Sequence, residues 1–182
     1  MTARPTSWCI PLDKRKVRLT IQDTVLFGVL GALTFGLQVV MGFLPNIEPV
    51  SLLVMLFAVV FGWKALYPIY TFVVMEILYY GFSLWNVYYL YIWAILAVVS
   101  ILLRKMENPL GWALVSAVYG LAFGALCGIV DIFIGGFGYA AAKWVSGIPY
   151  DLLHCAGNFV MALLLFKPLR QLLEKLYGRM RK

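Results

Sequence analysis

The sequence predicts an all-α integral membrane protein, a single bundle of six transmembrane helices with both chain ends in the cytoplasm. Of its 182 residues, 63% are hydrophobic and 13% are charged, which is more apolar side chain than a water-soluble domain of this length can bury. The apolar residues also fall into segments close to the roughly 20 residues with which a helix crosses a bilayer. Residues 1–182 are therefore expected to form one membrane domain.

The chain is expected to begin with a polar, basic arm. Pro5 and Pro11 argue against a stable helix at the very start. The basic stretch from Lys14 to Arg18 leads into a long apolar segment without a small-residue cleavage site. We therefore expect no cleavable signal, and the first helix is predicted to stay in the mature protein.

Turn signals separate the expected spans. Pro45-Asn46 ends the first span, Gly62-Trp63-Lys64 is a tight turn, and a polar loop runs from Arg104 to Pro109. A connection rich in Gly and Ala at 135–147 is expected to reach the last span, and 167–182 reads as a basic amphipathic tail on the membrane surface. The spans are expected at about 24–44, 50–63, 65–81, 87–103, 110–134 and 148–166.

Positive charges predict the orientation. With six spans, all fifteen Lys and Arg residues except Lys143 fall on one side of the membrane. Short cytoplasmic loops collect Lys and Arg. Both termini are therefore predicted to be cytoplasmic.

The acids are distributed differently, because Glu48, Glu76, Asp131 and Asp151 belong to the outer half, where Lys143 is the one base. They can form the walls of an outward-facing site, or they can be acids tolerated at outer helix ends. For Glu48 and Asp131 both interpretations stay open. Glu76 favours a site, because it lies about five residues, or roughly 7 Å, inside its span.

A polar stripe opens the last long apolar segment. Asp151, His154 and Asn158 are spaced three and four residues apart, so on a helix they share one face. Ionisable groups at membrane depth usually face the bundle interior or a wet cavity. The stripe is therefore interpreted as one wall of a small-molecule site.

Aromatic residues near the outer side suit a flat ligand. Asn86, Tyr89 and Trp93 recur at three and four residues in the fourth span, and Glu76 and Tyr80 stand one turn apart in the third. Aromatic walls with a few placed polar groups are typical of small-molecule pockets, although Trp and Tyr are also ordinary interfacial anchors.

Trp144, beside Lys143 in the outer connection, can be such an anchor or part of a lid. The predicted substrate-binding residues are Glu48, Glu76, Tyr80, Asn86, Tyr89, Trp93, Asp131, Lys143, Trp144, Asp151, His154 and Asn158.

Two faces of small residues allow close approach of helix backbones. The face in the fifth span is expected to pack within the bundle. The face in the first span can do the same or can meet a partner subunit. The positions are Gly28, Ala32 and Gly36 in the first span, and Ser116, Gly120, Gly124 and Gly128 in the fifth.

In size, span count, termini and basic ends, the chain resembles the substrate-binding S components of energy-coupling factor (ECF) transporters, small bacterial six-helix proteins that capture vitamins. That family carries an Ala-x-x-x-Ala pattern on helix one, which docks on the coupling subunit. The matching positions here are Gly28 and Ala32, with Gly36 one step on and glycine replacing the first alanine. The stretches Asn46 to Ser51 and Phe61 to Leu66 also look like members of the family.

The resemblance implies a multi-pass protein of the bacterial plasma membrane that serves an ATP-driven importer. It implies that loops one, three and five and the outer ends of helices four to six enclose the ligand. It also implies partners, namely a coupling subunit and two cytoplasmic ATPases that drive release by toppling the S component. Neither a cofactor nor a metal is implied.

The acids favour a neutral or cationic ligand, because a buried carboxylate is stabilised by an opposite charge or by hydrogen-bond donors. Thiamine or its pyrimidine, pyridoxine-type rings and aminated deazapurines all satisfy this. Free folate or pantothenate fits less well unless Lys143 or His154 meets its carboxylate. The expected contacts are Asp151 and Glu76 to ring donors, His154 and Asn158 for orientation, and Trp93 for stacking.

The two alternative classes of protein are an intramembrane enzyme and a stand-alone secondary transporter. An intramembrane enzyme lacks its usual parts, because the chain has one histidine and no His-Glu-x-x-His, Gly-x-Ser-Gly or Ser-x-x-Lys motif. His154 and Cys155 diverge by about 100° on a helix, so they would not chelate a metal together easily. A stand-alone secondary transporter normally shows inverted repeats and broken helices, and the sequence shows neither. We therefore expect no catalytic residue and no metal site.

Overall fold

The computed structural model describes residues 19–44 and 47–180, and every regular element in these ranges is helical. The basic N-terminal arm, the Pro45-Asn46 turn and the last two residues of the tail lie outside the described residues. The all-α prediction is confirmed for the described part. In chain order the elements are α1 (Ile21–Met41), α2 (Val50–Phe61), the 3-10 helix η1 (Gly62–Ala65), α3 (Leu66–Tyr80), α4 (Leu84–Leu102) and α5 (Pro109–Met180).

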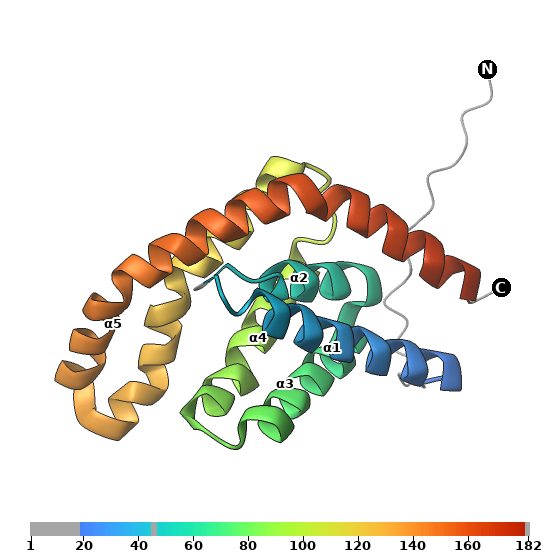
Figure 1. Cartoon of the computed structure of the whole chain (residues 1–182). Helices are drawn as coiled ribbons and strands as arrows, with labels where there is room; N and C mark the ends of the chain where they lie inside the picture. Colours follow the sequence, from blue (N-terminus) through green and yellow to red (C-terminus); the bar gives the residue numbers. More distant parts are fainter. Residues whose placement is uncertain (1–18, 45–46, 181–182) are drawn as a thin grey trace.

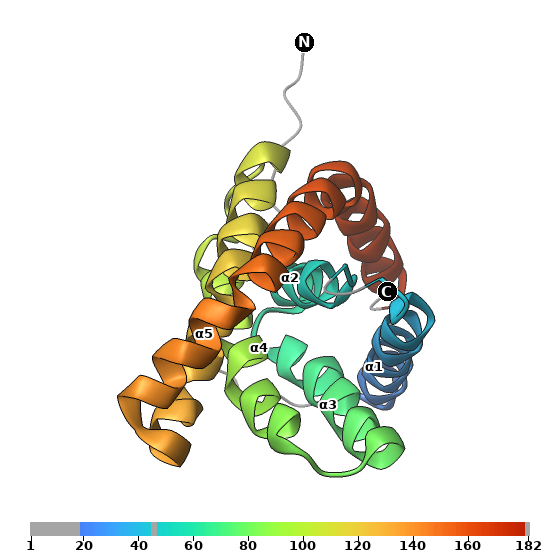
Figure 2. The same cartoon turned by 60° about the vertical axis from the view of Figure 1, so that its left-hand side comes forward.

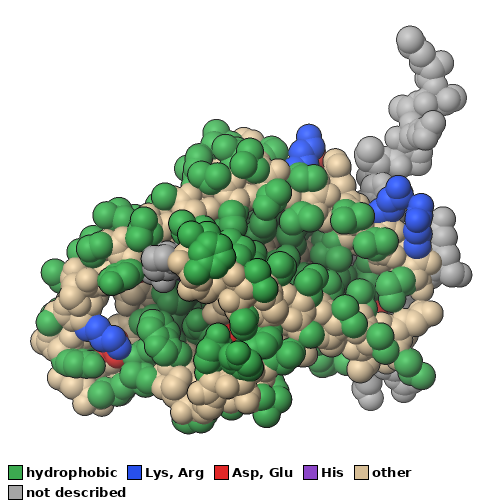
Figure 3. All heavy atoms as spheres, in the orientation of Figure 1, with side chains coloured by type: hydrophobic (Ala, Val, Ile, Leu, Met, Phe, Trp, Pro, Cys, Tyr) green, Lys and Arg blue, Asp and Glu red, His purple; other side chains and the backbone are tan. Residues whose placement is uncertain are grey.

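The surface of the bundle is apolar. Large side chains such as Val25, Val29 and Leu33 of α1 are exposed. Apolar side chains are spread over the whole face drawn in Figure 3, whereas charged side chains appear at few places on it. A surface of this kind favours association in water and is stable in lipid. The prediction of a membrane-embedded protein agrees with it. Within the described ranges, the stretches long and apolar enough to cross a membrane are Ile21–Met41, Val50–Tyr80, Leu84–Leu102 and Pro109–Met180.

These are four stretches where six separate spans were expected. One reason is that α2, η1 and α3 follow one another without an intervening loop. The other is that helix continues through the connection expected at 135–147. The helix ends also differ from the expected bounds. The first helix ends at Met41, and α4 begins at Leu84 because Ser83 caps it together with Asn86.

The reversal of the chain inside α5 is concentrated at Gly136. Its φ of 78° and ψ of 176° are non-helical, and glycine adopts positive φ without a Cβ penalty. Figures 1 and 2 both show the chain turning back in the orange part of α5. The expectation of a connection between two spans at 135–147 is therefore wrong for most of that range, since Ala140, Ala141 and Ala142 lie in regular helix, as suits strong helix formers.

Gly136 divides α5 into a first and a second arm. The second arm continues through residues 167–180, which were expected to form a separate tail on the membrane surface. It passes Pro149 and Pro168 without a break in helix and ends at Met180. Its red C-terminal part bends away from the direction of the orange part (Figure 1). Proline removes one main-chain hydrogen bond and is a common cause of helix bending.

On α1 the residue that allows close packing is Gly31. A Cβ at this position would lie 2.7 Å from the Pro68 carbonyl oxygen of α3, so only glycine lets these backbones approach. The face predicted from spacing lies elsewhere. A Cβ at Gly28 or Gly36 would meet nothing within 4 Å, and Ala32 is exposed. Among the described residues, this face is therefore without a packing partner.

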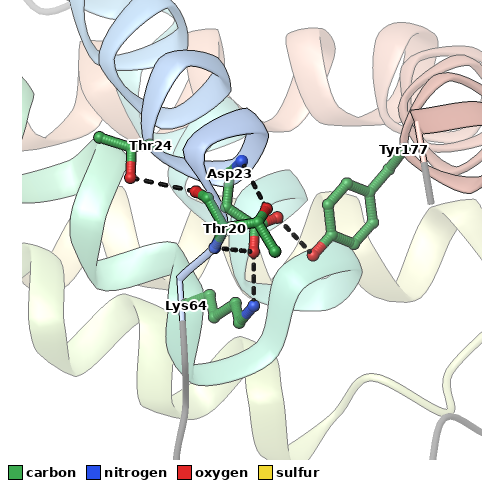
Figure 4. Close-up of polar contacts among 5 residues, drawn as sticks. All are labelled: Thr20, Asp23, Thr24, Lys64 and Tyr177. Carbon is green, nitrogen blue, oxygen red and sulfur yellow. Dashed lines mark hydrogen bonds and ion pairs between the residues drawn. The ribbon is translucent and has the colours of Figure 1, made fainter.

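Three elements meet at Asp23, near the start of α1 (Figure 4). Its carboxylate pairs with Lys64 of η1 at 2.7 Å and accepts a hydrogen bond of 3.2 Å from the Tyr177 hydroxyl of α5. The Thr20 backbone N–H donates to the same side chain, which completes a capping box for α1. Asp23 is buried, so the ion pair and both hydrogen bonds supply the partners that a buried charge requires.

Candidate functional site

A cavity of about 780 Å³ lies where α1 and α3 end and α4 begins, opposite the arms of α5. Its volume is in the range of small-molecule sites. The predicted binding residues that line it are Glu48, Glu76, Tyr80, Asn86, Tyr89, Asp131, Lys143, Trp144, Asp151 and His154. Trp93 and Asn158 do not line it.

One wall of the cavity is acidic. Glu76 of α3 is 7% exposed, and its Oε1 has no hydrogen-bond partner among the described residues. Glu48 lies in the connection between α1 and α2, outside the helices, and is half-buried. Burial, with the nearby Glu76 carboxylate as a second cause, raises the pKa of Glu48 to about 7. Two carboxylates in electrostatic contact therefore face the same space.

Asp131 belongs to a different cluster, in which its charge is already matched. Lys143 Nζ lies 2.8 Å from its Oδ1, and the Tyr88 hydroxyl donates to the same oxygen at 2.5 Å. Lys143 also donates to the Tyr88 oxygen at 2.8 Å and lies over the Tyr88 ring. Asp131 sits on the first arm of α5 and Lys143 on the second, so the cluster joins the two arms.

The polar stripe on the second arm of α5 faces the first arm. The Gly124 N–H donates to Asp151 Oδ1 at 3.1 Å, and Asn158 Nδ2 donates to the Ser116 carbonyl at 3.1 Å. Between them, a Cβ at Gly120 would lie 2.9 Å from the backbone of His154. Close packing, expected for the small face of the fifth span, is confirmed at these positions. Gly128 does not take part, because a Cβ there would meet nothing within 4 Å.

The residues of the stripe therefore have two different roles, because two of them line the cavity and the third packs the arms of α5 together. Asp151 and His154 line the cavity. Asp151 Oδ2 has no hydrogen-bond partner within the described part. The Trp144 side chain lies near the Asp151 carboxylate. His154 Nε2 lies 3.4 Å from Ser51 Oγ of α2. Asn158 does not line the cavity, and its Nδ2 holds the two arms of α5 together. Its expected role of orienting a ligand stays a prediction.

An aromatic cluster lies behind the cavity. Trp93 is fully buried and packs edge-on against Tyr89 at 5.4 Å and against Phe72 at 6.2 Å. It also touches Phe123, whose ring packs edge-on against His154 at 4.9 Å. Tyr89 and Phe123 line the cavity, and Trp93 supports them from behind. Other rings separate Trp93 from the cavity, so the expected stacking of a ligand on Trp93 has no support in this arrangement and stays a prediction.

The other predicted polar and aromatic residues lie around the cavity with different exposure. Asn86 is buried, and its Oδ1 accepts from the Ser83 N–H at 2.6 Å, so it caps α4 as well as lining the space. Tyr80 and Trp144 line the cavity and are exposed to 61% and 43%. They form the accessible part of its wall.

The cavity can bind a small organic molecule through unpaired carboxylate oxygens, hydroxyl groups and aromatic rings. No protein-family model, curated protein or solved structure matches this chain. The site thus stands on its geometry.

Several lining residues were not predicted from the sequence. Gln38 of α1 and Tyr88 and Cys127 on neighbouring helices all line the cavity. Gln38 carried a usable signal, because an amide inside the last turns of an apolar span is costly in lipid. Tyr88 and Cys127 carried none, since aromatic and thiol side chains are common in such segments.

Proposed function

We propose that this protein is the substrate-binding membrane subunit of an ECF-type importer of the bacterial plasma membrane. It captures a vitamin or a related flat, neutral-to-cationic heterocycle of the thiamine or pyrimidine, pyridoxine or deazapurine type from outside the cell. The observation that carries this proposal is the cavity at one end of the bundle, lined by aromatic rings and by two carboxylate oxygens, Glu76 Oε1 and Asp151 Oδ2, that have no hydrogen-bond partner among the described residues. ATP hydrolysis is the task of the partner subunits.

The proposal includes six spans with both ends in the cytoplasm. Gly62 and Gly136 both have positive φ, and these breaks divide two of the four long apolar stretches. The result is six helical segments, of which α2 is short, with 12 residues. Several basic residues lie away from the cavity, and none of them is among the described lining residues. Lys64 pairs with Asp23, and Arg170 Nη1 donates to the Met106 carbonyl in the loop that also carries Arg104. Grouped basic residues favour the cytoplasmic side.

The proposed partner surface is the face of Gly28, Ala32 and Gly36 on α1. It lies outside the described bundle, and small residues let a second helix approach closely. We infer that a coupling subunit docks there and that two cytoplasmic ATPases act through it. Gly28→Leu is expected to raise the melting temperature, because leucine favours helix over glycine by about 1 kcal/mol and no described atom lies within 4 Å of a Cβ there. The same variant is expected to reduce co-purification with the coupling subunit.

The test of ligand capture is the melting temperature of the purified protein in detergent. The panel contains B vitamins, their biosynthetic precursors and deazapurines. A molecule that binds the folded state and not the unfolded state stabilises the protein by about 2.7 kcal/mol when its free concentration is a hundred times its Kd. One selective stabiliser supports the proposal. A folded protein that no member of the panel stabilises argues against vitamin capture.

Reconstituted uptake separates the proposal from a stand-alone secondary transporter. In proteoliposomes that hold the stabilising ligand outside, uptake is expected to require the coupling subunit, both ATPases and ATP. Uptake by this chain alone would favour the secondary transporter instead.

A further inference from the structure

The charges that line the cavity do not balance. Four carboxylates line it, Glu48, Glu76, Asp131 and Asp151, and Lys143 is the one Lys or Arg among the described lining residues. The charge of Lys143 is already matched by Asp131, because its Nζ lies 2.8 Å from Asp131 Oδ1 and also 2.8 Å from the Tyr88 hydroxyl oxygen. The cavity therefore keeps an excess of negative charge.

The excess is greatest at the wall formed by Glu48 and Glu76. In the described part of the chain, neither carboxylate has a hydrogen bond or an ion pair. Glu76 is more than nine-tenths buried, and a buried charge without a partner is strongly unfavourable. A native structure that retains such a group normally has a use for it.

The surroundings of this wall suit a cation. Tyr89 lines the cavity beside both acids, and Tyr80 is one turn from Glu76 on α3. Aromatic ring faces attract cations. Within the described ranges, no three His, Cys, Asp or Glu side chains converge as metal ligands do, which favours an organic cation over a metal ion.

We propose that Glu48 and Glu76 form a subsite for the positively charged group of an organic cation, with Tyr89 beside it. This inference rests on the proposed function for its physiological role and adds to it the charge class of the substrate. The cation replaces the missing partner of both carboxylates, and the rest of a flat ligand extends toward Asp151 and His154.

The test uses three probes of similar shape and different charge: benzamidinium, benzamide and benzoate. Their Kd values are measured at pH 8 by thermal stabilisation of the detergent-solubilised protein, since both carboxylates need to be ionised. The wild type is expected to bind benzamidinium at least tenfold more tightly than benzamide, and benzoate most weakly. Glu48→Gln, Glu76→Gln and the double variant are expected to reduce this preference to less than about threefold. Glu107→Gln, an exposed acid in the loop before α5, is the matched control and should keep the full preference.

Equal stabilisation by benzamide, or none by benzamidinium, overturns the proposal in the wild type alone, so it stays testable even if a variant fails to fold. A tenfold preference that survives in the double variant overturns the assignment to these two residues. Failure here is distinct from failure of the proposed function. An anionic vitamin that stabilises the protein would support vitamin capture and overturn the cation subsite. A preference for benzamidinium without any ATP-driven uptake would support the cation subsite and overturn the role in an importer.

Discussion

Replacing Gly120 by alanine is expected to force apart the two arms of α5. The added Cβ would lie 2.9 Å from the backbone N of Cys155 and from the backbone C and O of His154. These atoms cannot rotate away as a side chain can. The distance of 2.9 Å to the His154 carbonyl carbon is about 0.6–1.1 Å shorter than the roughly 3.5–4.0 Å optimum for carbon atoms, so one arm has to shift.

The expected cost can be separated from helix propensity. Overpacking of this kind costs about 1–3 kcal/mol, and alanine gains about 1 kcal/mol over glycine inside a helix. Gly120→Ala is therefore expected to be destabilised by up to about 2 kcal/mol. Gly128→Ala on the same helix is the matched control, because its Cβ would meet nothing within 4 Å. This control is expected to gain about 1 kcal/mol.

The assay is the melting temperature of both variants in one detergent, followed by tryptophan fluorescence. At roughly 2–4 °C per kcal/mol for a chain of this size, Gly120→Ala should melt well below Gly128→Ala. A Gly120→Ala protein that melts at or above the control would refute the close contact. It would also remove the structural basis for placing His154 at the cavity.

Three further perturbations test the site and the bundle end. Burial and a neighbouring carboxylate raise the pKa of Glu48 from 4.5 to about 7, so between these values the folded protein binds more protons than the unfolded chain. The stability of the ligand-free protein should thus fall as pH rises from about 4.5 to about 7 and level off above, and Glu48→Gln should flatten the profile; an unchanged slope in that variant would contradict the assignment. Tyr177→Phe removes the 3.2 Å hydrogen bond to Asp23 and should cost about 1–2 kcal/mol in a denaturation curve, whereas a wild-type curve would mean that the hydroxyl contributes nothing. Asp131→Asn leaves the Lys143 ammonium without its ion-pair partner and should cost about 1–3 kcal/mol; adding Lys143→Gln should recover most of that loss in a double-mutant cycle, and strictly additive losses would show that the two residues are not coupled.

Composition and helical spacing were sufficient for the class of the protein and for much of the cavity. Glu76, Asp151 and His154 are polar residues at membrane depth, and lipid is a poor solvent for all of them. They had to face inward, and inward-facing polar residues from several helices meet in one space. That physical constraint acts on each residue alone, so a single sequence reveals it.

Spacing could not separate packing from cavity. Asn158 shares a helix face with Asp151, yet it bonds to the first arm of α5 and lies outside the lining. Trp93 shares a face with Tyr89 and is covered by neighbouring rings. Periodicity gives the direction of a side chain and carries no information about what lies in front of it.

The ion pair between Asp131 and Lys143 and the reversal of the chain at Gly136 also depend on tertiary contacts, which the sequence pattern does not show. The Asp131 and Lys143 pair forms across the turn at Gly136, and a segment rich in Gly and Ala is compatible with either loop or helix. In the sequence, nothing distinguishes Gly31 from Gly28 and Gly36 as a packing position. Only the close approach of Pro68 in the folded structure does so.

The cluster at Asp23 holds the end of α1 that lies away from the cavity. Asp23 joins α1, η1 and α5 through an ion pair and a hydrogen bond, whereas Gln38 at the cavity lies fifteen residues further along α1, or about 22 Å. A helix anchored at one end acts as a lever, so a tilt of about 5° around Asp23 carries Gln38 through about 2 Å. Such a tilt also moves α1 along α3, where Gly31 lies against Pro68 and Phe35 packs edge-on against Tyr79. A change of access to the cavity at this end of α1 therefore requires the contact between α1 and α3 to shift with it.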